Sequence, residues 1–217
     1  MSSLLLLIFI AALPVLIASL WLVLRKYPFG PLWFFSAMLA GIIALFVAAL
    51  IQNVFPTIPE NSNTFALIFK NFIQIALTEE GSRLILLILF FKISSRFKAL
   101  GPGDYPSHAL TTGLIAGLGF ALIETLSYAQ TDYRIALIRI ISASPLHAAC
   151  GARTGMSAAS ICRRNPDLKG FIYAFLIHGM YNLLIIRPGI PAFFPLVLAI
   201  MVLISSIARI NFRGEII

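Results

Sequence analysis

The stretch QIALTEEGSRLILLILFF (Gln74–Phe91) places two adjacent glutamates and an arginine inside an otherwise apolar run. The run is close to the length, about 20 residues, that a helix needs to cross the hydrocarbon core of a bilayer. Charged side chains are costly there, and those that occur usually face the interior of a helix bundle and mark a functional site. The stretch therefore predicts a membrane-spanning helix whose polar face, with Glu79, Glu80 and Arg83, belongs to such a site.

The whole chain has the composition of a membrane protein. Of its 217 residues, 60% are hydrophobic and 11% are charged, with a mean hydropathy of +0.97, whereas soluble domains carry about 25% charged residues. The net charge of +8 comes from short basic clusters between apolar runs, which is typical of topology signals. We therefore expect one integral membrane domain over residues 1–217, embedded in a lipid bilayer and without a nucleic-acid partner.

The apolar runs predict an all-α, polytopic transmembrane bundle with about seven spanning helices. Runs near spanning length cover 3–24, 31–55, 65–91, 108–129, 134–160, 168–186 and 191–210. In a seven-span arrangement most basic residues fall on one side: Arg25, Lys26, Lys92, Arg96, Lys98, Arg163, Arg164, Lys169, Arg209 and Arg213. Because basic loops stay in the cytoplasm, the N-terminus is expected outside and the C-terminus in the cytoplasm.

Two of these runs carry carboxylates with helical spacing. In TEEGSR, Glu79 and Arg83 are i,i+4 and share a face, so Arg83 is expected to hold Glu79 and to leave Glu80 free. In FALIE, Phe120 lies one turn before Glu124. The alternative interpretation is that Glu79 and Arg83 form an ion pair with a structural role only.

Two later runs carry histidines. In HAACG, Gly151 follows His147 by one turn and is expected to leave open space beside the imidazole. In HGMYN, His178 and Asn182 are i,i+4 and can address one point. A single buried His or Asn is often only a contact between helices. Arg153, in the same helix as His147, is expected either to pair with a carboxylate or to extend to an interface.

The depths of these polar groups overlap. At about 1.5 Å per residue, the predicted helices place the glutamates and histidines about 6–15 Å from the outer ends of their spans. The set can therefore converge between the outer leaflet and the midplane. Gly113 and Gly117 form a small-xxx-small pattern in TTGLIAGLGF, for which helix packing is the expected role.

Carboxylates and imidazoles in a cavity of low dielectric constant are the groups that activate water. A desolvated glutamate is an effective general base, and neutral His178 and Asn182 could donate hydrogen bonds to an oxyanion. Glu124, His147 and His178 could instead hold a divalent metal such as zinc with an open position for water. The sequence leaves both mechanisms open. We favour the metal-free one because the Glu-Glu-Arg and His-Asn groupings have roles without a metal. The motifs GxSxG and HExxH are absent.

Taken in order, EEGSR, FALIE, HAACG and HGMYN resemble the four motifs of PrsW-type intramembrane proteases, which share a superfamily with the CAAX prenyl endopeptidases. The resemblance covers about residues 70–186. Arg83 stands where PrsW proteins usually have Lys, and Asn182 where a carboxylate is often expected. The CAAX relatives typically carry His at the position of Glu124.

The resemblance implies a multi-pass endopeptidase, expected in a bacterial inner membrane, that cleaves single-pass membrane proteins such as an anti-sigma factor on the extracytoplasmic side. On that interpretation Glu79, Glu80, Glu124, His147, His178 and Asn182 are the catalytic candidates and Arg83 supports them. The alternatives are a CAAX-type prenyl-protein endopeptidase and a non-catalytic membrane scaffold or transporter.

Overall fold

The computed structural model describes residues 3–27, 30–101, 104–130, 133–187 and 189–210, and over these residues the chain contains helices and no strands. Arg213, which was used to predict the orientation, lies outside them, as does the side chain of Arg96. The helices are α1 (Ser3–Leu24), α2 (Pro31–Gln52), α3 (Thr64–Ile68), the π-helix η1 (Phe69–Leu77), α4 (Thr78–Ile93), α5 (Ser95–Ala99), α6 (Tyr105–Ala129), α7 (Tyr133–Ile141), α8 (Ala143–Cys162), α9 (Lys169–Ile186) and α10 (Phe193–Ile207).

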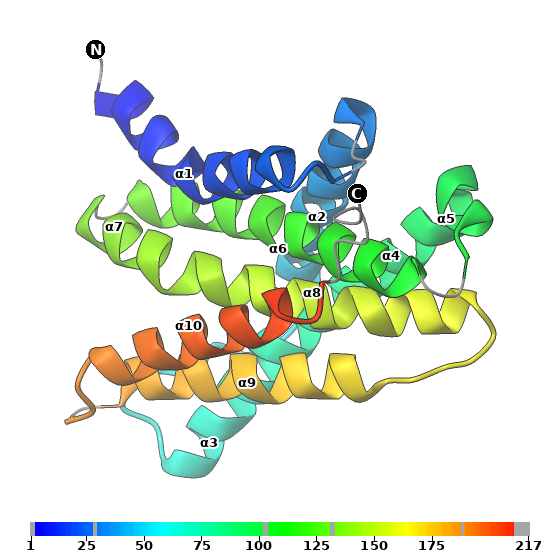
Figure 1. Ribbon diagram of the computed structural model, residues 1–217. Coiled ribbons are helices and arrows are strands. Elements are labelled where there is room, and N and C mark those ends of the chain that lie inside the picture. Colours follow the sequence, from blue (N-terminus) through cyan, green and yellow to red (C-terminus); the bar gives the residue numbers. More distant parts are fainter. Residues whose placement is uncertain (1–2, 28–29, 102–103, 131–132, 188, 211–217) are drawn as a thin grey trace.

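The centre of the bundle is α6, which packs mainly against α8 and α2. Its spanning window is 78% buried, whereas that of α1 is 17% buried. Figure 1 shows α8, α9 and α10 side by side and alternating in direction. Large apolar side chains such as Leu20, Phe46 and Met201 are exposed on the outer helices. A surface of this kind is stable only against lipid or another apolar partner.

Glycines bring α6 and α8 into backbone contact. A Cβ on Gly113 would overlap the carbonyl oxygen of Gly151, and one on Gly117 would overlap that of His147. This confirms the packing role predicted for Gly113 and Gly117. A Cβ on Gly151 would likewise overlap the carbonyl oxygen of Gly113, so Gly151 also serves the packing of α8 against α6.

The predicted runs correspond to helices, but the count of seven spans is not confirmed. Among the described residues, four helices (α1, α2, α6 and α9) are long and apolar enough to cross a membrane, and α7 with α8 makes a fifth if this pair, bent by 46°, is one span. The run predicted at 191–210 forms the shorter α10. The orientation of the termini stays a prediction.

The run Gln74–Phe91 lies within one continuous helical segment whose middle is irregular. Residues 64–93 are helical throughout, but Phe69–Leu77 form a π-helix that separates α3 from α4. Long π-helices are rare, and short ones are frequent at functional sites. The π-helix ends immediately before Thr78, so the two glutamates lie in the first turn of α4.

Candidate active site

Four helices bring their polar residues to one place, as the spacing predicted. α4 supplies Glu79, Glu80 and Arg83, α8 supplies His147, and α9 supplies His178, all of them buried. The imidazoles of His147 and His178 lie 4.9 Å apart, edge to face. Glu124 of α6 completes the group from the other side of His147.

Glu80 is completely buried and held on every side. Its Oε1 accepts a hydrogen bond from Arg83 Nη1 at 2.5 Å and another from His178 Nδ1 at 3.0 Å, while Oε2 accepts one from Thr154 Oγ1 at 2.9 Å. The predicted pairing of Arg83 with Glu79 is therefore wrong. Arg83 pairs instead with Glu80, three residues earlier, which an α-helix places on the same face. Both side chains of this ion pair are 0% exposed.

Glu79, in contrast, keeps an oxygen without a hydrogen-bond partner. Gln52 Nε2, at the end of α2, donates to Oε1 at 3.3 Å and also to Thr78 Oγ1 at 3.0 Å. Glu79 Oε2 is buried and accepts no hydrogen bond from the described residues. A buried carboxylate oxygen in this state is costly unless a ligand, an ion or a water completes it.

The group opposite this oxygen is His178. Because Nδ1 of His178 donates to Glu80, the neutral ring presents the lone pair of Nε2, and this atom lies 3.6 Å from Glu79 Oε2. Two acceptors that face each other are stabilised by a proton, a water or a cation between them. The carboxylate–histidine arrangement of Glu80 and His178 is also the one that orients metal-binding imidazoles.

His147 is held from both sides. Arg83 Nη2 lies 3.3 Å from its Nδ1, and its Nε2 lies 2.8 Å from Glu124 Oε2. Glu124 also forms an ion pair with Arg139 Nη2 at 2.5 Å. The Arg83 guanidinium stacks on the ring of Phe120 at 4.5 Å, which gives the first residue of the FALIE motif a place in the site.

A cavity of about 440 Å³ opens onto these groups. Its lining includes Glu79, Glu124, His147, His178 and Asn182, together with residues of α2 and η1. Glu80 does not line it. Asn182 is half-buried at the wall and lies one turn beyond His178, as its spacing predicted.

Glu79, His147 and His178 form a possible metal-binding set. One ligand atom from each of the three lies within 4.8 Å of the others. The prediction named Glu124 as the carboxylate of this set, but the structure brings Glu79 to the two histidines while Arg139 neutralises Glu124. The unpaired Oε2 of Glu79 and the free lone pair of His178 Nε2 fit a divalent cation. His147 would have to exchange one of its two contacts to become a ligand.

Three contributing residues were not predicted. Gln52, Thr154 and Arg139 contact Glu79, Glu80 and Glu124 respectively. Thr154 lies seven residues, or two turns, after His147 and therefore shares its face, so the helical period could have indicated it. Gln52 and Arg139 come from segments that carry no motif, and only the tertiary structure identifies them.

A buried cluster of glutamates and histidines, within a bundle of apolar helices and open to a cavity, is the arrangement that an intramembrane hydrolase of the multi-pass type requires. Residues 30–207 match the family described as PrsW family intramembrane metalloprotease. The chain belongs to this family. No curated protein and no solved structure matched the chain.

Proposed function

We propose that the chain is an endopeptidase that hydrolyses a peptide bond of a single-pass membrane protein with a water molecule activated at Glu79. The observation that supports this most directly is the contrast between the two glutamates. Glu79 lines the cavity with an unpaired oxygen, while Glu80 is buried behind it with both oxygens occupied. Membership of the family supports the class of reaction.

In this mechanism the water lies between Glu79 Oε2 and the cavity. Its oxygen attacks the carbonyl carbon of the scissile bond while Glu79 accepts one of its protons. The tetrahedral intermediate then collapses with cleavage of the C–N bond as Glu79 passes this proton to the leaving nitrogen, so that a carboxylic acid and an amine result. The amide of Asn182, at the cavity wall, donates to the oxyanion. His178 is kept in place by Glu80, which is in turn held by Arg83 and Thr154.

Glu79, His147 and His178 would also hold a divalent ion such as zinc. A bound ion would supply Lewis-acid polarisation and a more acidic water. Glu79 would then serve as one of the ligands, while the residues that position the two histidines keep their roles in either case. Glu80 fixes the tautomer of His178, and the pair of Glu124 and Arg139 sets the position of His147.

The predicted orientation indicates on which side of the membrane the substrate is cut. If the basic ends of the helices are cytoplasmic, the cavity lies in the extracytoplasmic half of the membrane, because Lys70 and Ile186, which line it, lie near the opposite ends of their helices. That is where a site-one cleavage of an anti-sigma-like protein in a bacterial inner membrane would occur. A CAAX-type endopeptidase would need a cavity that opens toward the cytoplasm.

The test is a cleavage assay in proteoliposomes with a single-pass substrate, the cleavage position being read by mass spectrometry. We expect a cut in the outer half of the substrate span, abolished in His178→Ala and retained in Asp104→Asn, a control at an exposed position remote from the site. Full cleavage by the His178 variant would refute the proposal. Cleavage only of a prenylated cytoplasmic peptide would support the CAAX alternative, and no hydrolysis of either substrate would favour a scaffold or transporter.

A further inference from the structure

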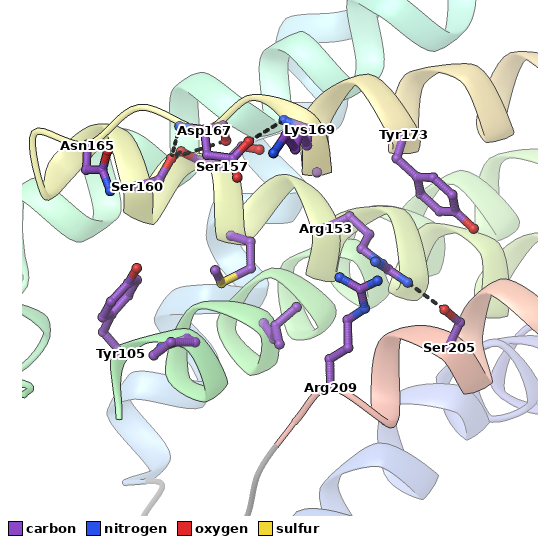
Figure 2. A pocket seen from close by; sticks show the side chains of 14 residues that line it. Tyr105, Arg153, Ser157, Ser160, Asn165, Asp167, Lys169, Tyr173, Ser205 and Arg209 are labelled. Carbon is purple, nitrogen blue, oxygen red and sulfur yellow. Dashed lines mark hydrogen bonds between the residues drawn. The ribbon is translucent and has the colours of Figure 1, made fainter. Parts of the chain in front are cut away.

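A second polar cavity lies away from the active site, at the basic end of the bundle. It has a volume of about 660 Å³, and Figure 2 shows the side chains that line it, from α6, α8, α9, α10 and the segments that follow α8 and α10. Helix α8 separates the two cavities. Arg153 faces the basic one, and the next residue, Thr154, donates to Glu80 in the active site.

The cavity carries an excess of positive charge. Arg153, Lys169 and Arg209 line it, while Asp167 is the one acidic residue among its described lining residues, so the balance is three minus one, or +2. The guanidinium groups of Arg153 and Arg209 lie near each other in Figure 2 and repel each other electrostatically. Two like charges beside a cavity favour an anion between them.

Arg153 is the anchor of this arrangement. Its side chain is buried and donates to Ser206 Oγ at 3.0 Å and to Ser205 Oγ at 2.7 Å, and its guanidinium lies over the ring of Tyr173 at 4.8 Å. Within the described part of the chain it forms no ion pair with a carboxylate. The sequence left open whether Arg153 pairs with a carboxylate or extends to an interface, and the pairing is not seen among the described residues. Arginine is well suited to bind a phosphate, because its planar guanidinium presents several donors that match the phosphate oxygens.

An apolar cavity follows the basic one along α6 and α10. Leu110 of α6 lines the basic cavity, and Leu114 and Leu118, one and two turns farther along the same face, line a cavity of about 530 Å³ with almost wholly apolar walls. The three leucines belong to one hydrophobic cluster. Together the two cavities offer a charged recess and a neighbouring hydrocarbon-like space.

We propose that the recess formed by Arg153, Lys169 and Arg209 binds the phosphate of an anionic phospholipid, with an acyl chain in the adjoining apolar cavity. The shared chemistry of possible ligands is a phosphate anion, which free inorganic phosphate also offers. The apolar cavity favours the lipid. Basic recesses between spanning helices on the cytoplasmic side recognise lipid head groups in this way, and the recess lies at the end where the predicted topology places the cytoplasm.

The test measures lipid binding to the delipidated full-length protein in neutral detergent by native mass spectrometry. Phosphatidylglycerol is compared with phosphatidylcholine and with inorganic phosphate. The variant Lys169→Gln/Arg209→Gln removes two exposed charges and keeps the buried Arg153. Arg164→Gln, an exposed residue at the same end that does not line the cavity, is the matched control.

We expect phosphatidylglycerol to bind more tightly than phosphatidylcholine. Binding should weaken about fivefold for each charge removed and therefore about 25-fold in the double variant, with Arg164→Gln unchanged. Equal binding of the two lipids, or no loss in the double variant, would overturn the proposal. Displacement of the bound lipid by micromolar inorganic phosphate would assign the recess to a soluble phosphate and overturn the lipid assignment.

Discussion

Replacing each of the adjacent glutamates by glutamine should separate catalysis from stability. In Glu80→Gln the buried charge of Arg83 loses its partner across 2.5 Å, and both groups are 0% exposed. Breaking a buried ion pair costs about 3–5 kcal/mol. For a chain of this size each kcal/mol lowers the melting temperature by about 2–4 °C, so the fall should be about 6–20 °C.

Glu79→Gln should behave in the opposite way. Its Oε1 accepts one long hydrogen bond from Gln52 and its Oε2 accepts none, so the amide preserves most of what the carboxylate contributes. The change in stability should stay within about 1 kcal/mol. The rate of cleavage should fall about 10²- to 10⁴-fold, because the base is lost.

Both variants are measured by thermal unfolding in detergent and by kcat for a single-pass substrate at a temperature well below either transition. Glu80→Gln should keep some activity, about 10- to 100-fold below wild type, because His178 loses its orienting carboxylate. Wild-type kcat in Glu79→Gln would refute the reasoning. So would equal losses of stability in the two variants, because the contrast in burial and pairing would then have no energetic effect.

Three further outcomes follow from the site. Metal analysis of the purified chain should find about one divalent ion per molecule. This ion should be lost in His178→Ala and after treatment with a chelator, and the chelator should also stop cleavage. A metal-free enzyme that resists the chelator would contradict the metal site and leave Glu79 as the sole activator of water. Gly117→Ala should destabilise the fold by about 1–3 kcal/mol in thermal unfolding, because its Cβ meets the backbone of His147, and an unchanged transition would contradict the close contact of α6 and α8. Arg139→Met should raise KM or lower kcat by releasing Glu124 and His147, whereas Arg134→Met, a surface arginine of the same helix, should not.

The helical class and the convergence of the polar residues could be predicted from the sequence, because both depend on local information, whereas the catalytic roles of these residues stay a prediction. Apolar runs define helices in lipid, and the 3.6-residue period places His178 and Asn182, or Phe120 and Glu124, on one face. The site residues had to face inward because each is charged or polar in an apolar surrounding.

The pairing within the site could not be predicted, because it depends on how helices cross. Spacing allowed Arg83 to reach either glutamate, and the choice of Glu80 is made by Thr154 of α8 and His178 of α9, which surround that carboxylate. The π-helix before α4 has no signature in the apolar pattern, and it sets the rotation at which Glu79 and Glu80 enter the bundle. Gln52 and Arg139 reach the site from segments that the motifs do not include.

The glycine contact between α6 and α8 divides the active site into a fixed part and a part able to move. The backbones of these two helices are in close contact and His147 Nε2 lies 2.8 Å from Glu124 Oε2, so we expect Glu124 and His147 to stay together as one wall. The remaining lining of the cavity comes largely from α2, η1 and the end of α9. Any widening that admits an unwound polypeptide therefore has to come from that side, and a crosslink between α6 and α8 should leave substrate entry intact while one between α2 and η1 should block it.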